Sequence, residues 1–159
     1  VARGQHHAPW AAFTQPAAGA PSATSGQPMA VLSSEYDNVT LALVYVWPSL
    51  AATVPMQLEQ VGAHGLMHVQ GGSVTADGLL VLTTDQHMNP GGCDVFTFNV
   101  TAYLRGETSA VAPLVSSQRS NFVAGLAETE GATVDADGRL WVVTNFIDVD
   151  PAIYTYTRN

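Results

Sequence analysis

Three histidines are the clearest candidate metal ligands in the sequence. His64 and His68 are four residues apart, and His87 follows further along the chain. On a helix, two histidines at this spacing share a face and can bind one zinc ion. Gly62 and Gly65 favour strand and turn instead, and on a strand the two side chains would lie about 13 Å apart, too far for one ion. Two interpretations therefore stand: a zinc site, or ordinary polar residues at the surface of a β-sheet.

Acidic residues gather near the end of the chain. Asp148 and Asp150 follow Asp135 and Asp137. Carboxylate oxygens suit calcium, although this spacing differs from that of an EF-hand loop. Calcium is therefore the second candidate metal, and the alternative is a set of solvated acids in turns.

Three further residues are candidates for covalent modification. Cys93 is the only cysteine, so it is either a free thiol or the half of a disulfide to another polypeptide. Asn38 and Asn99 each begin an N-x-T sequon and are candidate glycosylation sites, which favours a secreted protein. No G-x-S-x-G elbow or phosphate-binding loop is present, so the sequence does not indicate a particular enzyme class.

The composition predicts a folded, acidic protein. Of 159 residues, 47% are hydrophobic and only 11% are charged, which is too apolar for a disordered chain. The net charge is −8 and lysine is absent, so binding to nucleic acid or to an anionic membrane is not expected. No apolar run is long enough to predict a membrane span.

The elements that must position these residues are predicted to be β-strands. Residues 1–30 are rich in Ala, Pro, Gly and Ser and predict an extended arm, whereas residues 31–159 read as β-structure. Aromatic and β-branched strands recur, as in 94–100. Asp77-Gly78 and Asp137-Gly138 predict two-residue type I′ hairpins, in which both central residues have positive φ.

An internal repeat is the most specific feature of the sequence. Residues 65–84 match residues 125–144 at a constant offset of 60, with nine of twenty positions identical. Residues 96–98 then correspond to residues 154–156. The repeated unit is strand, turn, strand, loop and aromatic strand, followed by a shorter strand. A four-stranded antiparallel unit at a fixed period is typical of a β-propeller blade, and the alternative is a duplicated hairpin in a sandwich or barrel.

The repeat also predicts stacking and an incomplete ring. Leu140 and Val142 alternate with Trp141 and Val143, so both faces of this strand are apolar and one sheet cannot hide them alone. At 60 residues a blade, 159/60 gives about 2.65 blades, whereas propellers have about 4–8. We therefore expect two to three four-stranded blades of a partial ring: a cleaved fragment, or a protomer that closes its ring with other chains.

The stretch 136–145, ADGRLWVVTN, resembles two groups of propellers. One is the royal-jelly/yellow family, and the other is the gluconolactonase/senescence-marker group. Asp94 and Phe146 depart from the yellow-type pattern, which has an aromatic and a basic residue there. The lactonase resemblance implies a channel metal held by acidic and Asn side chains, for which Asn145 is the matching position.

Together these features predict a secreted β-propeller module that binds other molecules or builds a larger extracellular assembly. Its expected partner is another polypeptide or further copies of itself. The alternative function is that of a piece of a metal-dependent, lactonase-like hydrolase.

Overall fold

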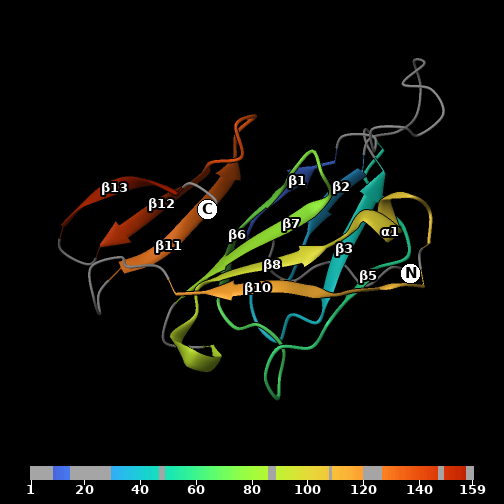
Figure 1. The fold of residues 1–159 in the computed structure, drawn as a ribbon, viewed down its shortest axis with the longest axis horizontal. Coiled ribbons are helices and arrows are strands. Elements are labelled where there is room, and N and C mark those ends of the chain that lie inside the picture. Colours follow the sequence, from blue (N-terminus) through green and yellow to red (C-terminus); the bar gives the residue numbers. More distant parts are fainter. Residues whose placement is uncertain are drawn as a thin grey trace.

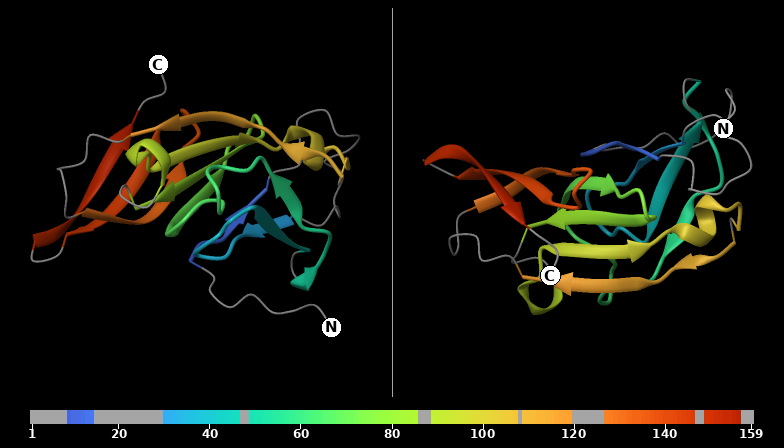
Figure 2. Two further views of the ribbon diagram at one scale, coloured as in Figure 1. Left: turned by 90° about the horizontal axis from the view of Figure 1, so that it is seen from below. Right: turned by 45° about the horizontal axis from the view of Figure 1, so that its top comes forward.

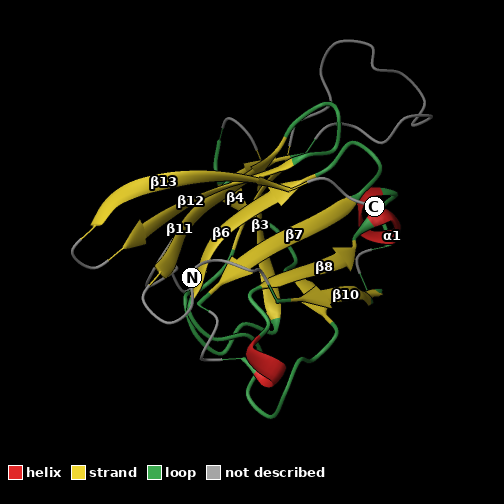
Figure 3. Cartoon of the chain, turned by 60° about the vertical axis from the view of Figure 1, so that its left-hand side comes forward, coloured by secondary structure: helices red, strands yellow, loops and turns green. Residues whose placement is uncertain are grey.

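The protein is described here from a computed structural model. It describes residues 9–14, 30–46, 49–85, 89–107, 109–119, 127–146 and 149–156. These residues are mostly β-strand, with one short helix, α1 (Thr101–Leu104), and a 3₁₀ turn at Pro90–Gly92 (Figure 3). The predicted β class and low helix content are confirmed.

The central sheet is a four-stranded antiparallel meander. Its strands are β6 (Val69–Val74), β7 (Leu79–Thr84), β8 (Val95–Asn99) and β10 (Leu114–Gln118), in that spatial order. The aromatic side chains of β8 alternate with Thr97 and Asn99, and Phe96 and Phe98 are buried. The strand order is the one predicted for the repeated unit.

The last sheet repeats the central one. It contains β11 (Ala127–Val134), β12 (Leu140–Phe146) and β13 (Val149–Tyr156). Val74 pairs with Leu80 in the central sheet, and Val134 pairs with Leu140 in the last one. Each first strand also has a register shift at the same place, between 69 and 71 and between 129 and 131. Residues that lie 60 positions apart in the sequence therefore occupy equivalent positions in the two sheets.

The two Asp-Gly hairpins have three-residue loops, so the predicted type I′ turns are wrong. Positive φ occurs at Gly78 (84°) and Gly138 (78°) but not at the aspartates before them. The carbonyl of Thr75 accepts the N–H of Gly78, and the Thr75 N–H donates to Leu79. This is a tight turn closed by one left-handed glycine, which leaves the preceding aspartate in an ordinary conformation.

The first sheet is built from less regular strands. In spatial order it contains β1 (Ala12–Phe13), β2 (Ala30–Ser33), β3 (Leu41–Val46), β5 (Met56–Leu58) and β9 (Val111–Ala112), and β4 (Ala51–Ala52) also pairs with β3. Pairing is antiparallel except between β5 and β9. The strand β1 comes from the region predicted to be an arm, where Trp10 is buried.

The three sheets stack, with the central sheet between the other two (Figures 1 and 2). The main core lies between the first and central sheets and includes Leu32, Val44, Leu82 and Phe98. The first strand of each sheet lies against the next, since β1 contacts β6 and β6 contacts β11. The described residues do not form a closed ring.

Candidate functional site

The face of the central sheet that points toward the last sheet is covered over β6 and β7, the two strands that contact β11. Ser73 and Val81 are paired across β6 and β7, and both are buried. The N–H of Val134 on β11 donates to the Ser73 Oγ at 3.0 Å. A Cβ added to Gly71 would lie 2.6 Å from the backbone nitrogen of Ala132, so glycine is needed there for the two backbones to approach. This face is an interface between two repeats.

The corresponding face of the last sheet is uncovered. At the offset of 60, Thr133, Trp141 and Val143 stand where Ser73, Val81 and Thr83 stand in the central sheet. Trp141 is 38% exposed and Val143 is 42% exposed. A Cβ added to Gly131, the counterpart of Gly71, would meet nothing within 4 Å. An indole and a valine are thus partly exposed side by side on this sheet face, which is the arrangement of a docking surface. We call Gly131, Thr133, Trp141 and Val143 the open face.

The indole of the open face is held in place by the hairpin turn below it. Its Nε1–H donates to Asp135 Oδ2 at 2.8 Å. The other Asp135 oxygen, Oδ1, accepts the N–H groups of Asp137 and Arg139. These bonds, that from Trp141 first, lower the pKa of Asp135 below its ordinary 3.8, and the Arg139 charge acts in the same direction. The ionised carboxylate therefore fixes both the turn and the orientation of the exposed ring.

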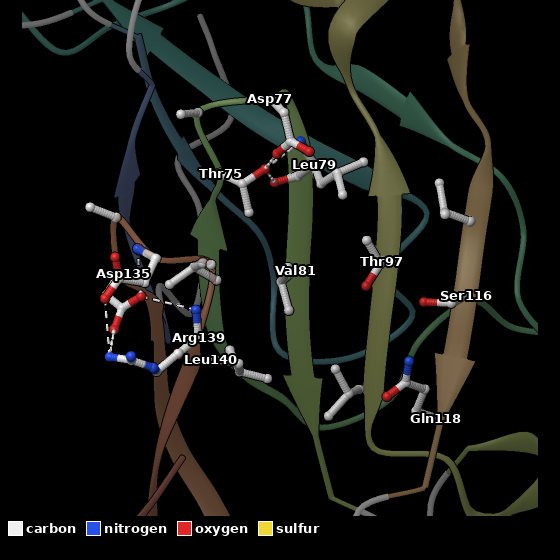
Figure 4. Close-up of a pocket in the computed structure, with 17 residues that line it drawn as sticks. Thr75, Asp77, Leu79, Val81, Thr97, Ser116, Gln118, Asp135, Arg139 and Leu140 are labelled. Atoms are coloured by element: carbon white, nitrogen blue, oxygen red, sulfur yellow. Dashed lines mark hydrogen bonds and ion pairs between the residues drawn. The ribbon is translucent and has the colours of Figure 1, made fainter. Parts of the chain in front are cut away.

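A cleft of about 670 Å³ lies between the outer strands of the central sheet and the hairpin turn of the last sheet. Figure 4 shows Asp135 and Arg139 on one side, with Thr97, Ser116 and Gln118 on strands opposite them. Arg139 is paired with Asp137 at 3.1 Å and with Asp135 at 3.8 Å. The described lining offers hydroxyl, amide and charged groups over an apolar base, and it lacks histidine and cysteine. Such a lining suits hydrogen bonding to a small polar molecule.

His68 is the predicted site residue with the most defined surroundings. Its Nδ1 lies 3.1 Å from Asp85 Oδ2, its Nε2 lies 3.7 Å from Asp37, and its ring stacks on Tyr36. The backbone has a left-handed φ of 52°, and the His68 N–H donates to Asp37. These carboxylates hold the imidazole in a strained loop conformation. Sequence reasoning missed both of them, because they are distant in the chain.

The other predicted metal ligands are not brought to His68 within the described residues. His64 is exposed in a separate turn. Asn145 lies in β12 but its side chain, like His87, Asp148 and the side chain of Asp150, is outside the described part. No group of three His, Cys, Asp or Glu that could hold a metal occurs among the described side chains. Zinc, calcium and the lactonase-type metal stay predictions.

The candidate modification sites differ in their surroundings. Asn38 is exposed, with a left-handed φ of 55°. Asn99 is half-buried, and its Oδ1 accepts the N–H and hydroxyl of Thr101. Cys93 is a half-buried free thiol beside the main core. Glycosylation and an intermolecular disulfide stay predictions.

Comparison of the chain with known protein families, with curated proteins and with solved structures finds no match. Within the described residues, no helix has the length and apolarity required to cross a membrane. The internal repeat is therefore the feature from which a function can be inferred. The sequence had already indicated the two-faced apolar strand at 140–143, but not which of its faces is covered.

Proposed function

We propose that the chain is a secreted β-propeller module whose sheets are consecutive blades. Its function is to bind other molecules or to form part of a larger extracellular assembly. In this proposal the open face is the surface that receives the next blade. The Asp-Gly hairpins and the cleft beside them form part of a rigid surface for ligands.

The way in which the sheets follow one another supports this proposal. Successive sheets contact through their first strands, β1 with β6 and β6 with β11. The central sheet is a complete four-stranded meander, the last sheet is a three-stranded one, and the first sheet contains the antiparallel run β1-β2-β3-β5. Radial stacking of such meanders about their first strands is the arrangement of a propeller. Because successive sheets pack against each other in the same way, a further sheet would pack against the open face in that way too.

The single observation that carries the proposal is the difference in exposure between equivalent residues. Val81 and Thr83 are buried by the following sheet, whereas Trp141 and Val143, at the same positions of the repeat, are exposed. Burying an indole and a valine side chain stabilises an interface by about 2–3 kcal/mol each. A sheet face with this composition is stabilised when another sheet covers it.

A chain extended by one repeat tests this proposal. Tyr156 pairs with Leu140 as Phe98 pairs with Leu80, so a copy of residues 99–156 is joined after Tyr156. This copy supplies the equivalent of β10 and a further sheet, and its tryptophan is replaced by phenylalanine so that only Trp141 is read. Hydroxyl-radical oxidation of Trp141, measured by mass spectrometry, should fall to the level of the buried Trp10.

The matched control is the same extended chain carrying Gly131→Val. A valine at this position blocks the backbone approach that Gly71 permits in the central sheet, so Trp141 should stay accessible. If Trp141 is oxidised as fast in the extended chain as in the original one, the open face does not receive a repeat and the proposal is wrong.

A further inference from the structure

We infer that the cleft between the central and last sheets binds a neutral carbohydrate, with hydroxyl and amide side chains of β8 and β10 as its hydrogen-bonding groups. This inference rests on the part of the proposed function that assigns the cleft to ligands, and it names their chemical class. Both walls of the cleft belong to sheets described above, so the site does not depend on a further sheet at the open face.

The cleft is a wedge that the stacking of the two sheets leaves open. The last sheet contacts β6 and β7 through β11, and the wedge opens over β8 and β10. On its other side, β8 fills the space with Phe96 and Phe98, which are buried in the main core. On the side of the wedge it presents the smaller Val95 and Thr97. A volume of about 670 Å³ therefore remains between the sheets, which is within the usual range for a small-molecule site.

The charged groups of the cleft are already paired. Asp135 accepts hydrogen bonds through both oxygens, and Arg139 is paired with Asp135 and Asp137. Asp77 accepts the hydroxyl of Thr75. An anionic ligand would meet three carboxylates and one guanidinium that they already neutralise. A cationic ligand would compete with Arg139 for the same carboxylates. The lining therefore favours a ligand without net charge.

Three neutral polar side chains line the cleft and are available to a ligand. Thr97 and Ser116 are paired across β8 and β10, and Gln118 is paired with Val95 on the same face. Among the described residues, none of these three polar side chains has a hydrogen-bond partner. Hydroxyl and amide groups both donate and accept, so this row can bind a molecule that also does both.

A carbohydrate matches this combination of groups. Its closely spaced hydroxyls donate and accept, and the C–H groups of its ring form an apolar face. Val81 and Leu140 supply apolar surface from the two sheets. A peptide fits less well, because peptides that bind to sheets pair with free backbone groups at an edge. Strands β7 and β8, which form the base of the cleft, are paired on both edges.

Binding of defined sugars to the full chain tests this inference. The probes are maltose, cellobiose, lactose and N,N′-diacetylchitobiose, and the readout is the set of backbone amide chemical shifts of the isotope-labelled chain. At least one probe should shift the amides of Thr97, Ser116 and Gln118 to saturation. Ser116→Ala should weaken this binding by about 3- to 10-fold, because one hydrogen bond is lost. Ser117→Ala, the same change on the opposite face of β10, is the matched control and should leave the affinity unchanged.

Charged counterparts of two probes test the second part of the argument. Chitobiose has ammonium groups where diacetylchitobiose has amides, and cellobiouronate has a carboxylate where cellobiose has a hydroxymethyl group. Neither should bind more tightly than the neutral sugars. The inference is overturned by the absence of saturable shifts with all four sugars, by tighter binding of a charged one, by equal losses in Ser116→Ala and Ser117→Ala, or by binding of a blocked alanine tripeptide in place of the sugars. Oxidation of Trp141 in the extended chain is measured without sugar, so failure of carbohydrate binding leaves the next-sheet part of the proposed function standing.

Discussion

The central and last sheets share a sequence pattern and a strand arrangement but have different neighbours. They share register, register shift and turn hydrogen bonds: Thr75 and Asp135 each accept, through a side-chain oxygen, the N–H of the residue four positions later. They differ in what covers them, since β6 and β7 of the central sheet are packed on both faces, whereas β11 and β12 of the last sheet are packed on one. The repeat thus determines how each sheet folds, and its neighbours determine which side chains become core.

The two described tryptophans provide the largest contrast between covered and open faces. Trp10 is buried, its indole donates to Ser34 Oγ at 2.9 Å, and its ring lies where a Cβ on Gly72 would be. We expect Trp10→Ala to reduce the free energy of unfolding by about 3–5 kcal/mol. Trp141→Ala should cost less, about 1–2 kcal/mol, because part of the indole is already exposed and a single hydrogen bond is lost.

Urea denaturation measures both effects, at a chain concentration where light scattering shows monomers. Trp141→Phe provides a control that keeps an aromatic ring and loses the indole N–H. Equal losses for Trp10→Ala and Trp141→Ala would show that the open face is already part of the monomer's core, which would remove the contrast.

A smaller effect on the free energy of unfolding is expected at an unsatisfied polar group that the central sheet has and the last sheet lacks. The Thr83 hydroxyl is fully buried and has no hydrogen-bond partner, and the repeat has Val143 at this position. Thr83→Val keeps the shape and removes the unsatisfied hydroxyl, so it should raise the free energy of unfolding by about 1 kcal/mol. Thr84→Val, at the neighbouring buried threonine whose hydroxyl accepts a hydrogen bond from the Asn89 amide, is the comparison and should not stabilise. Thermal unfolding that ranks the two variants the other way would contradict this account.

The repeat made much of the fold predictable from sequence, and the exceptions have physical causes. The pairing of β6 with β7 and of β11 with β12 follows from the pattern that the two repeats share. The register within each of these strand pairs was therefore predictable. The loop length was not, because Asp-Gly fits both a two-residue turn and a three-residue loop with one left-handed glycine. Strand β1 was read as an arm because two residues show no alternation. The exposure of Trp141 depends on which neighbour is present, and no local pattern encodes that.

The smallest expected effect is a difference in pH response between the two hairpin turns. The Trp141 indole and two backbone N–H groups lower the pKa of Asp135 below 3.8, and this depression means that the folded state prefers the ionised form. The stabilisation is therefore fully present above 3.8 and is lost as the pH falls through the lowered pKa. Thr75, at the same position of the central sheet, has no charge to lose.

Backbone amide chemical shifts give a matched pair: the N–H of Arg139 donates to Asp135, and that of Leu79 donates to Thr75. The Arg139 amide should titrate with a midpoint below 3.8, and Asp135→Asn should abolish this titration. The Leu79 amide should stay constant in an Asp77→Asn background, which removes the carboxylate that accepts the Thr75 hydroxyl. A midpoint at or above 3.8 would mean that the indole does not hold the carboxylate, and the orientation of the open face would then need another cause.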